Sequence, residues 1–245
     1  MGALAAIVGG IALVPLSLAV SLYGKVPLPV TLLLGHAAAA GLVVAVSASS
    51  DATAKRTTGL LGKDQRTGRI SKLSVIAWWP YHVGLQTKLF IQWRKNKGPK
   101  GEPLYNQVAP QLYIGGWPKS LAVLPPGREL SVVDVTCELP RTHNTGGGYL
   151  CLPTWDTHAP DAAAIQRAVE FSLSQLQLGR DVYVHCAHGH GRSATVLAAV
   201  LIAGGTAKSP EEAVALMRRV RPKVRLNAKQ QAALLAWIDH ISKLN

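Results

Sequence analysis

Cysteine and acidic residues are both scarce in this chain. Its 245 residues include three cysteines, and 13 Asp or Glu stand against 26 Lys or Arg. The cysteines, Cys137, Cys151 and Cys186, show neither a disulfide framework nor the paired spacing of a zinc site. We therefore expect a reducing compartment and no metal, and no feature implies an organic cofactor.

Charged side chains are nearly absent from the first 50 residues, where Lys25 is the only one. No positive segment precedes the first apolar run, which argues against a cleaved signal peptide, and the lack of arginine argues against a transit peptide. Residues 2–23 and 28–48 are each about 21 residues long, enough to cross a hydrocarbon core of roughly 30 Å. Their small residues favour close helix packing. We predict that residues 1–50 form a transmembrane helical hairpin.

The basic excess is concentrated just after this hairpin. Residues 51–100 contain eleven Lys or Arg and two Asp, which supplies nine of the net +13 charges. Such a block attracts nucleic acid, anionic lipid or acidic ligands. Because it follows an apolar segment, we interpret it as the cytoplasmic flank of a membrane anchor that contacts an anionic lipid surface. No recognisable reading module or interleaved base-stacking aromatics are present, so we expect no nucleic-acid partner.

Residues 51–103 form a juxtamembrane region with a second apolar stretch at 73–93. That stretch also contains Pro80, His82 and Lys88. Its tryptophans and flanking basic residues favour a kinked amphipathic helix at headgroup level. Cover for the next domain and a third span are the alternatives, and a third span would move that next domain away from the cytoplasmic face. Residues 96–103, with two Pro and two Gly, are predicted to be a linker.

From residue 104 to residue 245, short apolar runs alternate with helical periodicity, which is typical of a sheet covered by helices. The predicted fold is α/β, a central, mostly parallel sheet flanked by helices. We expect strands at 111–114, 130–135, 149–152 and 181–185. Helices are expected at 161–178, 194–203, 209–220 and 227–244, with capping signals at Ser209 and Asn227.

Residues 181–193 carry the most informative pattern, a buried strand, a glycine-containing loop and an apolar helix. The loop N–H groups of residues 187–192 can point at one dianion, and the helix dipole adds positive potential there. The substrate-binding residues expected in this loop are Ala187, His188, Gly189, His190, Gly191 and Arg192. A cysteine at its start, Cys186, is expected to be a thiolate nucleophile, and Arg192 is expected to pair two phosphate oxygens.

His185-Cys186, five further residues and then Arg192-Ser193 resemble the signature of the protein tyrosine phosphatase superfamily, and the compact domain is similar to its dual-specificity branch. The resemblance implies that Ser193 helps to expel the thiolate from a cysteinyl-phosphate and that His185 orients the loop. It also implies a segment near Asn227 that approaches the mouth of the site and supports it.

Phosphate-ester cleavage also needs a general acid to protonate the leaving oxygen. In the resembled family an aspartate lies about 30 residues before the cysteine, on a mobile loop. Asp156 fits this position, and Asp161 is its rival. We favour Asp156, because Asp161 stands just before a helix, where an N-cap role is expected.

The loop leaves the substrate open. His188 and His190 stand where lipid phosphatases of one group have lysines. The sequences around Cys186 and Ser209 are also similar to phosphatidylglycerophosphate phosphatases of mitochondrial type. The first hypothesis is a membrane-anchored phosphatase of phosphotyrosine or phosphoserine/threonine proteins. The alternatives are a phospholipid headgroup phosphatase, acting on phosphatidylglycerophosphate or a phosphoinositide, and an inactive phospho-binding scaffold.

Overall fold

The computed structural model describes residues 3–95, 101–119, 124–125 and 129–243. The chain divides into two compact units. The first comprises Met1–Gly62 and Ile70–Gly101, and the second comprises Lys63–Arg69 and Glu102–Asn245. The three predicted domains stay a prediction, and most of the predicted linker, residues 96–100, lies outside the described residues.

The first unit begins with a helical hairpin made of α1 (Ala3–Leu22) and α2 (Leu28–Ser47). A Cβ added at Gly41 would meet the Cβ of Ala12 at 2.7 Å, so the small residues do bring the two helices close together. Many large apolar side chains on both helices are exposed, among them Ile11 and Leu32. By length and composition, both helices could cross a membrane. The predicted hairpin is confirmed within one or two residues at each end.

The remainder of the first unit is also helical. A capping box at Ser50 starts α3 (Asp51–Arg56), and Ser71 caps α4 (Lys72–Ala77). Helix α5 (Trp79–Lys95) follows after a break at Trp78. The kink predicted within residues 73–93 is therefore present. Trp79, Phe90 and Trp93 of α5 are exposed, and the placement of this helix at headgroup level stays a prediction.

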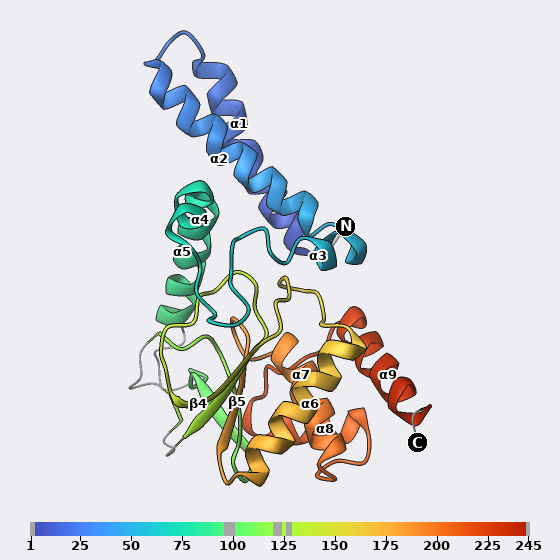
Figure 1. Ribbon diagram of the computed structural model, residues 1–245. Coiled ribbons are helices and arrows are strands. Elements are labelled where there is room, and N and C mark those ends of the chain that lie inside the picture. Colours follow the sequence, from blue (N-terminus) through green and yellow to red (C-terminus); the bar gives the residue numbers. More distant parts are fainter. Residues whose placement is uncertain (1–2, 96–100, 120–123, 126–128, 244–245) are drawn as a thin grey trace. The chain divides into compact units, whose positions relative to one another are not determined.

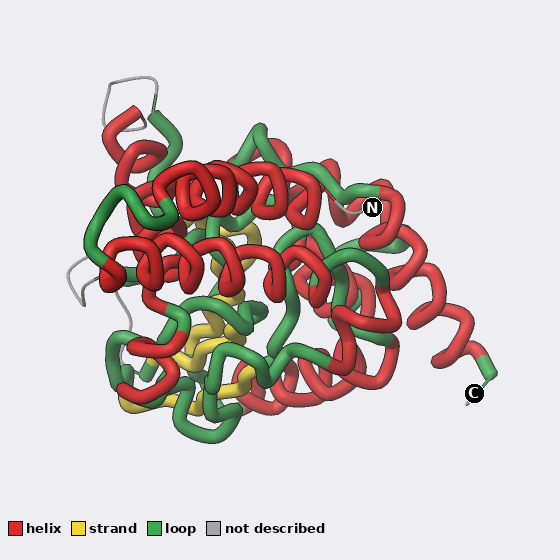
Figure 2. Tube along the Cα trace, turned by 90° about the horizontal axis from the view of Figure 1, so that it is seen from above, coloured by secondary structure: helices red, strands yellow, loops and turns green. Residues whose placement is uncertain are grey.

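The second unit is built on a five-stranded sheet in the order β1-β2-β5-β3-β4. Figure 2 shows the strands gathered in one group. The strands are β1 (Tyr105–Ala109), β2 (Leu112–Gly115), β3 (Leu130–Asp134), β4 (Gly146–Cys151) and β5 (Asp181–His185). All pairings are parallel except β1 with β2. The short edge strand β1 was not predicted, because its pattern lacks the continuous apolar run that marks the buried strands.

Four helices pack together against the sheet of the second unit (Figure 1). They are α6 (Ala162–Gln177), α7 (Arg192–Ala203), α8 (Pro210–Val220) and α9 (Ala228–Ser242). Side chains cap three of these helices: Asp161 caps α6, Ser209 caps α8 and Asn227 caps α9, each by accepting a backbone hydrogen bond. The caps at Ser209 and Asn227 were predicted, and a cap at Asp161 was the reason for preferring Asp156 as the acid. Helix α7 is buried from Arg192 to Leu201. This explains why its sequence is almost entirely apolar.

The opposite side of the sheet carries a separate cluster that includes Tyr113, Leu130, Val132 and Tyr183. The main core, by contrast, joins β2, β3 and β5 to the four helices. The carboxyl ends of the parallel strands β3 and β5 lie side by side, since Asp134 is in register with His185. This edge of the sheet is where ligands bind in open parallel sheets.

Burial predicts the sensitivity of this core to truncation. Leu197 is fully buried within α7, so Leu197→Ala is expected to lower the free energy of unfolding by about 2–5 kcal/mol through lost transfer energy and a cavity. Leu235 of α9 is 56% exposed, and Leu235→Ala is the matched control, with a change within about 0.5 kcal/mol. Denaturation of the full chain in detergent measures both, and equal effects would contradict the assigned core.

Candidate active site

The loop of residues 186–192 joins β5 to α7 at the carboxyl edge of the sheet. Gly189 has φ +76°, and a Cβ there would meet the backbone of Gly115 within 2.7 Å. Gly191 is the N-cap of α7, and a Cβ there would meet the side-chain amide of Gln230. The loop therefore requires glycine at position 189, for its torsion angle and for close approach to the backbone, whereas a Cβ at position 191 would displace the side-chain amide of Gln230.

Cys186 is buried at the start of this loop. Its Sγ accepts a hydrogen bond from the N–H of Gly189 at 3.3 Å and from Oγ of Ser193 at 3.4 Å. Burial alone would raise the pKa of Cys186, but the charge of Arg192 and hydrogen bonds from Ser193 and the His188 backbone outweigh it, so the pKa is lowered. A larger fraction of Cys186 is thus ionised to the thiolate than of an ordinary cysteine at the same pH.

Arg192 is buried at the other end of the loop, and its guanidinium is fixed by a carboxylate. Nη1 and Nη2 donate to the two carboxylate oxygens of Glu138 at 2.9 and 2.7 Å, and Nη1 also donates to the carbonyl of Thr154 at 2.7 Å. The Nε atom is buried and has no hydrogen-bond partner among the described residues. Three of the five N–H groups of the guanidinium thus hold its plane in place, and the N–H of Nε is among those left for a ligand oxygen.

Asp156 lies on the loop between β4 and α6, as the sequence predicted. Its Oδ1 is 3.3 Å from Nη2 of Arg192, and its side chain is 30% exposed. The loop is constrained next to it, because Thr157 adopts φ +67° and its carbonyl accepts a hydrogen bond from Asn227 Nδ2 at 2.8 Å. Asp161, the rival carboxylate, accepts from the N–H of Ala164 and caps α6. Asp156 is therefore the carboxylate that faces the site.

An open pocket of about 570 Å³ lies over the loop. Its lining combines the nucleophile candidate with basic and amide side chains: Cys186, Arg192, Asp156, Arg218, Arg225, Asn227 and Gln230, with His188 and His190. Arg218 and Arg225 are exposed, and the N–H of Arg225 donates to the carbonyl of His190 at 3.0 Å. This pocket is suited to anions with more than one negative group.

Arg221 lies between Arg218 and Arg225 in the sequence but has a different role. It is buried, and its Nε and Nη2 donate to the carbonyls of Gly189 and His188 at 3.0 and 2.7 Å. Its Nη2 lies 3.1 Å from Glu102, which also contacts Nε2 of His190. Burial alone would raise the pKa of Glu102, but His190 and Arg221 lower it. Arg221 thus stabilises the loop rather than facing solvent.

His185 is buried beneath the loop. Its Nδ1 is 3.3 Å from the carbonyl oxygen of Cys186, and its Nε2 is 3.9 Å from Asp134. Burial lowers the pKa of His185, although Asp134 opposes this. These contacts suit an orienting role.

Of the residues predicted in the loop, Cys186, His188, His190, Gly191 and Arg192 line one pocket together with Asp156. Ala187 and Gly189 are not among the residues that line this pocket, and the carbonyl of Ala187 accepts a hydrogen bond from the N–H of Trp117. Sequence reasoning missed Glu138, Glu102 and the burial of Gln230. A signal for Glu138 existed, since in a chain with few acidic residues it follows a buried strand by four positions. No group of three or more His, Cys, Asp or Glu that could hold a metal gathers within the described residues.

Comparison with known proteins agrees with this geometry. Residues 112–240 match the model of the family described as dual specificity phosphatase, catalytic domain. The phosphatidylglycerophosphate phosphatase PTPMT1 of Arabidopsis thaliana is 39% identical over 87 residues, which cover 36% of this chain and 25% of that protein. The phosphatidylglycerophosphatase and protein-tyrosine phosphatase 1 of Rattus norvegicus is 41% identical over 100 residues, 40% of this chain and 51% of that protein.

The matches thus span a quarter to about half of these two curated relatives. Among solved structures, the crystal structure of PTPMT1 in complex with PI(5)P is similar, with 25% identity and a TM-score of 0.51 over 58% of this chain and 98% of that one. The family match covers more than half of the chain and includes the loop, Asp156 and the pocket. The chain belongs to the dual specificity phosphatase catalytic domain family.

Proposed function

We propose that this chain is a membrane-anchored phosphatase that hydrolyses a phosphate monoester on a phospholipid headgroup through a cysteinyl-phosphate. The observation that carries the proposal is the placement of Cys186 and Arg192 at the two ends of one loop, with Asp156 beside Arg192 at 3.3 Å. These side chains supply a nucleophile, a charge clamp and a proton donor, the three parts that the reaction needs.

In the first step, Sγ of Cys186 attacks phosphorus, and the bond from phosphorus to the ester oxygen breaks. Asp156 transfers its proton to that oxygen, which leaves as an alcohol. Arg192 and the loop N–H groups stabilise the charge on the remaining phosphate oxygens. Because Glu138 already orients the guanidinium, little rearrangement is needed during the reaction.

In the second step, water attacks the cysteinyl-phosphate, and the Asp156 carboxylate accepts the proton that the water loses. The sulfur–phosphorus bond breaks, and inorganic phosphate is released. Ser193 donates its hydroxyl hydrogen to the departing sulfur, which lies 3.4 Å from its Oγ. This hydrogen bond stabilises the thiolate as a leaving group.

Three observations favour a lipid over the protein substrates that the sequence placed first. Both curated relatives are named as phosphatidylglycerophosphate phosphatases, and the name of the second also gives protein-tyrosine phosphatase. The first unit presents two apolar helices suited to a bilayer. The pocket carries Arg218 and Arg225 beyond the loop, which suit a second anionic group such as the phosphodiester of a lipid headgroup. The predicted cytoplasmic orientation stays a prediction.

The thiolate can be tested by alkylation. Because the pKa of Cys186 is lowered, its iodoacetamide reaction should reach half-maximal rate below the ordinary cysteine pKa of about 8.5. Ser193→Ala should move that midpoint upward, since one hydrogen bond to the thiolate is lost. Cys137 and Cys151 are internal controls read by mass spectrometry, because burial raises both pKa values, that of Cys151 to about 12. Equal rates at all three would contradict the assignment.

The substrate can be tested with the full chain in vesicles. Phosphate release is expected from phosphatidylglycerophosphate, and it should disappear in Cys186→Ser, which lacks the thiolate. Phosphotyrosine peptides serve as the competing substrate. Release from peptides alone would restore the protein hypothesis, and no release from any substrate would favour the phospho-binding scaffold.

The second anionic subsite makes a separate prediction. Arg225→Ala should raise KM for the lipid by about tenfold or more, as expected for a lost charge-assisted hydrogen bond, and should leave KM for p-nitrophenyl phosphate unchanged. Arg219→Ala is the matched control, since Arg219 is exposed but lies outside the pocket lining. An equal effect of Arg225→Ala on both substrates would argue against the subsite.

A further inference from the structure

Lys63 belongs to the basic segment after the hairpin, yet it is buried in the second unit. Its Nζ donates to Oδ2 of Asp134 at 2.6 Å, to the carbonyl of Thr136 at 2.8 Å and to Oγ1 of Thr136 at 3.0 Å. The three contacts account for the three donors of an ammonium group. Burial lowers the pKa of Lys63, but Asp134 outweighs this, so the pKa is raised and the charge is retained.

The contacts of Lys63 lead to Arg192 through one short stretch of chain. The N–H and Oγ1 of Thr136 donate to Oδ1 of Asp134 at 3.0 and 2.7 Å, so the turn after β3 is closed around the lysine. Two residues further on, Glu138 makes its two hydrogen bonds to Arg192. The position of this turn therefore determines where the carboxylate of Glu138 lies, and with it the plane of the guanidinium.

A second route leads from Lys63 to the nucleophile. Asp134 Oδ2, which accepts from Lys63, is also 3.9 Å from Nε2 of His185 and accepts from the hydroxyl of Tyr149 at 2.9 Å. His185 in turn contacts the carbonyl of Cys186. One buried ammonium group thus lies at the origin of two contact chains, which end at the two ends of the loop.

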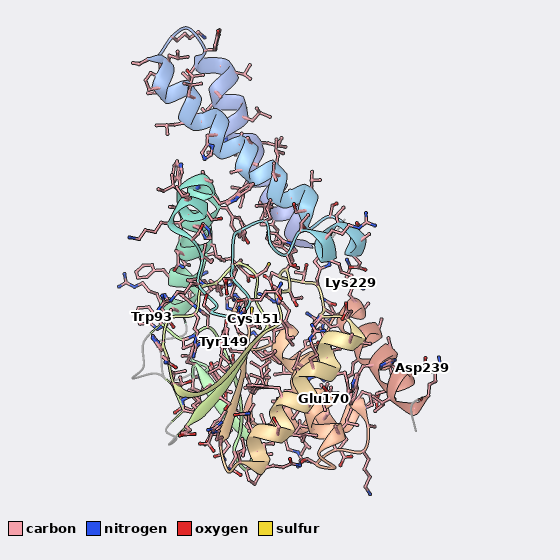
Figure 3. The ribbon with its side chains drawn as sticks, in the orientation of Figure 1. Trp93, Tyr149, Cys151, Glu170, Lys229 and Asp239 are labelled. Atoms are coloured by element: carbon pink, nitrogen blue, oxygen red, sulfur yellow. The ribbon has the colours of Figure 1, made fainter. Side chains whose placement is uncertain are left out.

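The segment that delivers Lys63 is held in place as a tight turn. The N–H of Asp64 donates to the carbonyl of Arg69 at 2.9 Å, and the carbonyl of Gly68 accepts from the N–H of Arg141 at 2.7 Å. Gly68 has φ +71°, and a Cβ there would collide with the hydroxyl of Tyr149 and with Arg141. Tyr149 is labelled in Figure 3, close to Cys151 on the same strand. The turn requires glycine for both conformation and contact.

We propose that Lys63 is a positioning residue of the active site, supplied by a chain segment that lies before the family domain at residues 112–240. Its ammonium group fixes the turn that carries Glu138 and thereby aims Arg192 at the phosphate. This inference rests on the proposed function, since it concerns the same site. The burial of Lys63 also corrects the prediction that the basic block of residues 51–100 contacts lipid throughout.

Stability alone is a weaker account of the contact. A buried ion pair contributes little net stability, because desolvation of both charges offsets their attraction. Other charged residues of the same turn, such as Arg66, are exposed and make no comparable contact with the sheet. The position that Lys63 imposes on the turn before Glu138 explains why this particular lysine is buried.

The test uses the full chain in detergent with p-nitrophenyl phosphate, which is independent of lipid binding. Lys63→Met is expected to lower kcat by about tenfold to a hundredfold through misplacement of Arg192, with KM nearly unchanged. Gly68→Ala, which keeps the lysine in the sequence but displaces the turn that positions it, should lower kcat in the same way. The kcat of the double variant should be no lower than that of the more impaired single variant, because both changes act on one contact. Arg66→Met is the matched charge control and should retain the original kcat.

A readout separate from turnover is the protection of Cys186 from iodoacetamide by vanadate, a transition-state analogue that requires a correctly placed Arg192. Lys63→Met should weaken this protection while Cys186 remains reactive. If the unsubstituted chain hydrolyses no substrate, the proposed function fails. The positioning role of Lys63 is then still tested by the protection of Cys186 that vanadate gives.

If Lys63→Met does not fold, Lys63→Met combined with Asp134→Asn removes the uncompensated charge. The carbonyl of Thr136 still lacks its donor, so kcat and vanadate protection should remain low in that double variant. If any folded variant that lacks Lys63 has the same kcat as the unsubstituted chain, the proposal is overturned.

Discussion

The bidentate contact between Glu138 and Arg192 is the interaction on which the site depends. A guanidinium buried to 1% exposure loses its hydration, and a paired carboxylate is what makes that burial tolerable. The same pair fixes the plane of the fork, so Nε and the region around Cys186 stay available to a phosphate. Removal of Glu138 would therefore affect the fold and the chemistry together.

The electrostatics of the loop follow from this pair. A fully buried thiol would ordinarily resist ionisation, because burial disfavours the charged form. In Cys186 the charge of Arg192 and the hydrogen bonds of the loop reverse that effect. Cys137 and Cys151 show the contrast, since they are also buried but burial raises their pKa values. The loop, rather than burial itself, distinguishes Cys186, the proposed nucleophile, from the other two thiols.

Much of the fold and the centre of the site could be predicted from sequence because their signals are local. The hairpin helices, the caps at Ser209 and Asn227, and the loop with its glycines depend on residues that are neighbours in the chain. The spacing of Asp156 pointed to it as the proposed general acid through a family resemblance. Glu138 and Lys63 could not be found in this way, since their partners lie 54 and 71 residues away and only the folded sheet brings them together. A lysine among other basic residues carries no sequence signal of burial.

The seven residues Lys63–Arg69 belong to the second unit, although both flanking segments belong to the first. The polypeptide therefore passes between the units at three positions instead of one. Exchange of catalytic domains by recombination at a single point requires that each module be continuous in the gene. A crossover anywhere between Ile70 and Gly101 would exchange the segment Lys63–Arg69, which holds the buried lysine of the second unit, together with the first helices. The interrupted order thus constrains how the two units can diverge, because each retains a segment embedded in the sequence of the other.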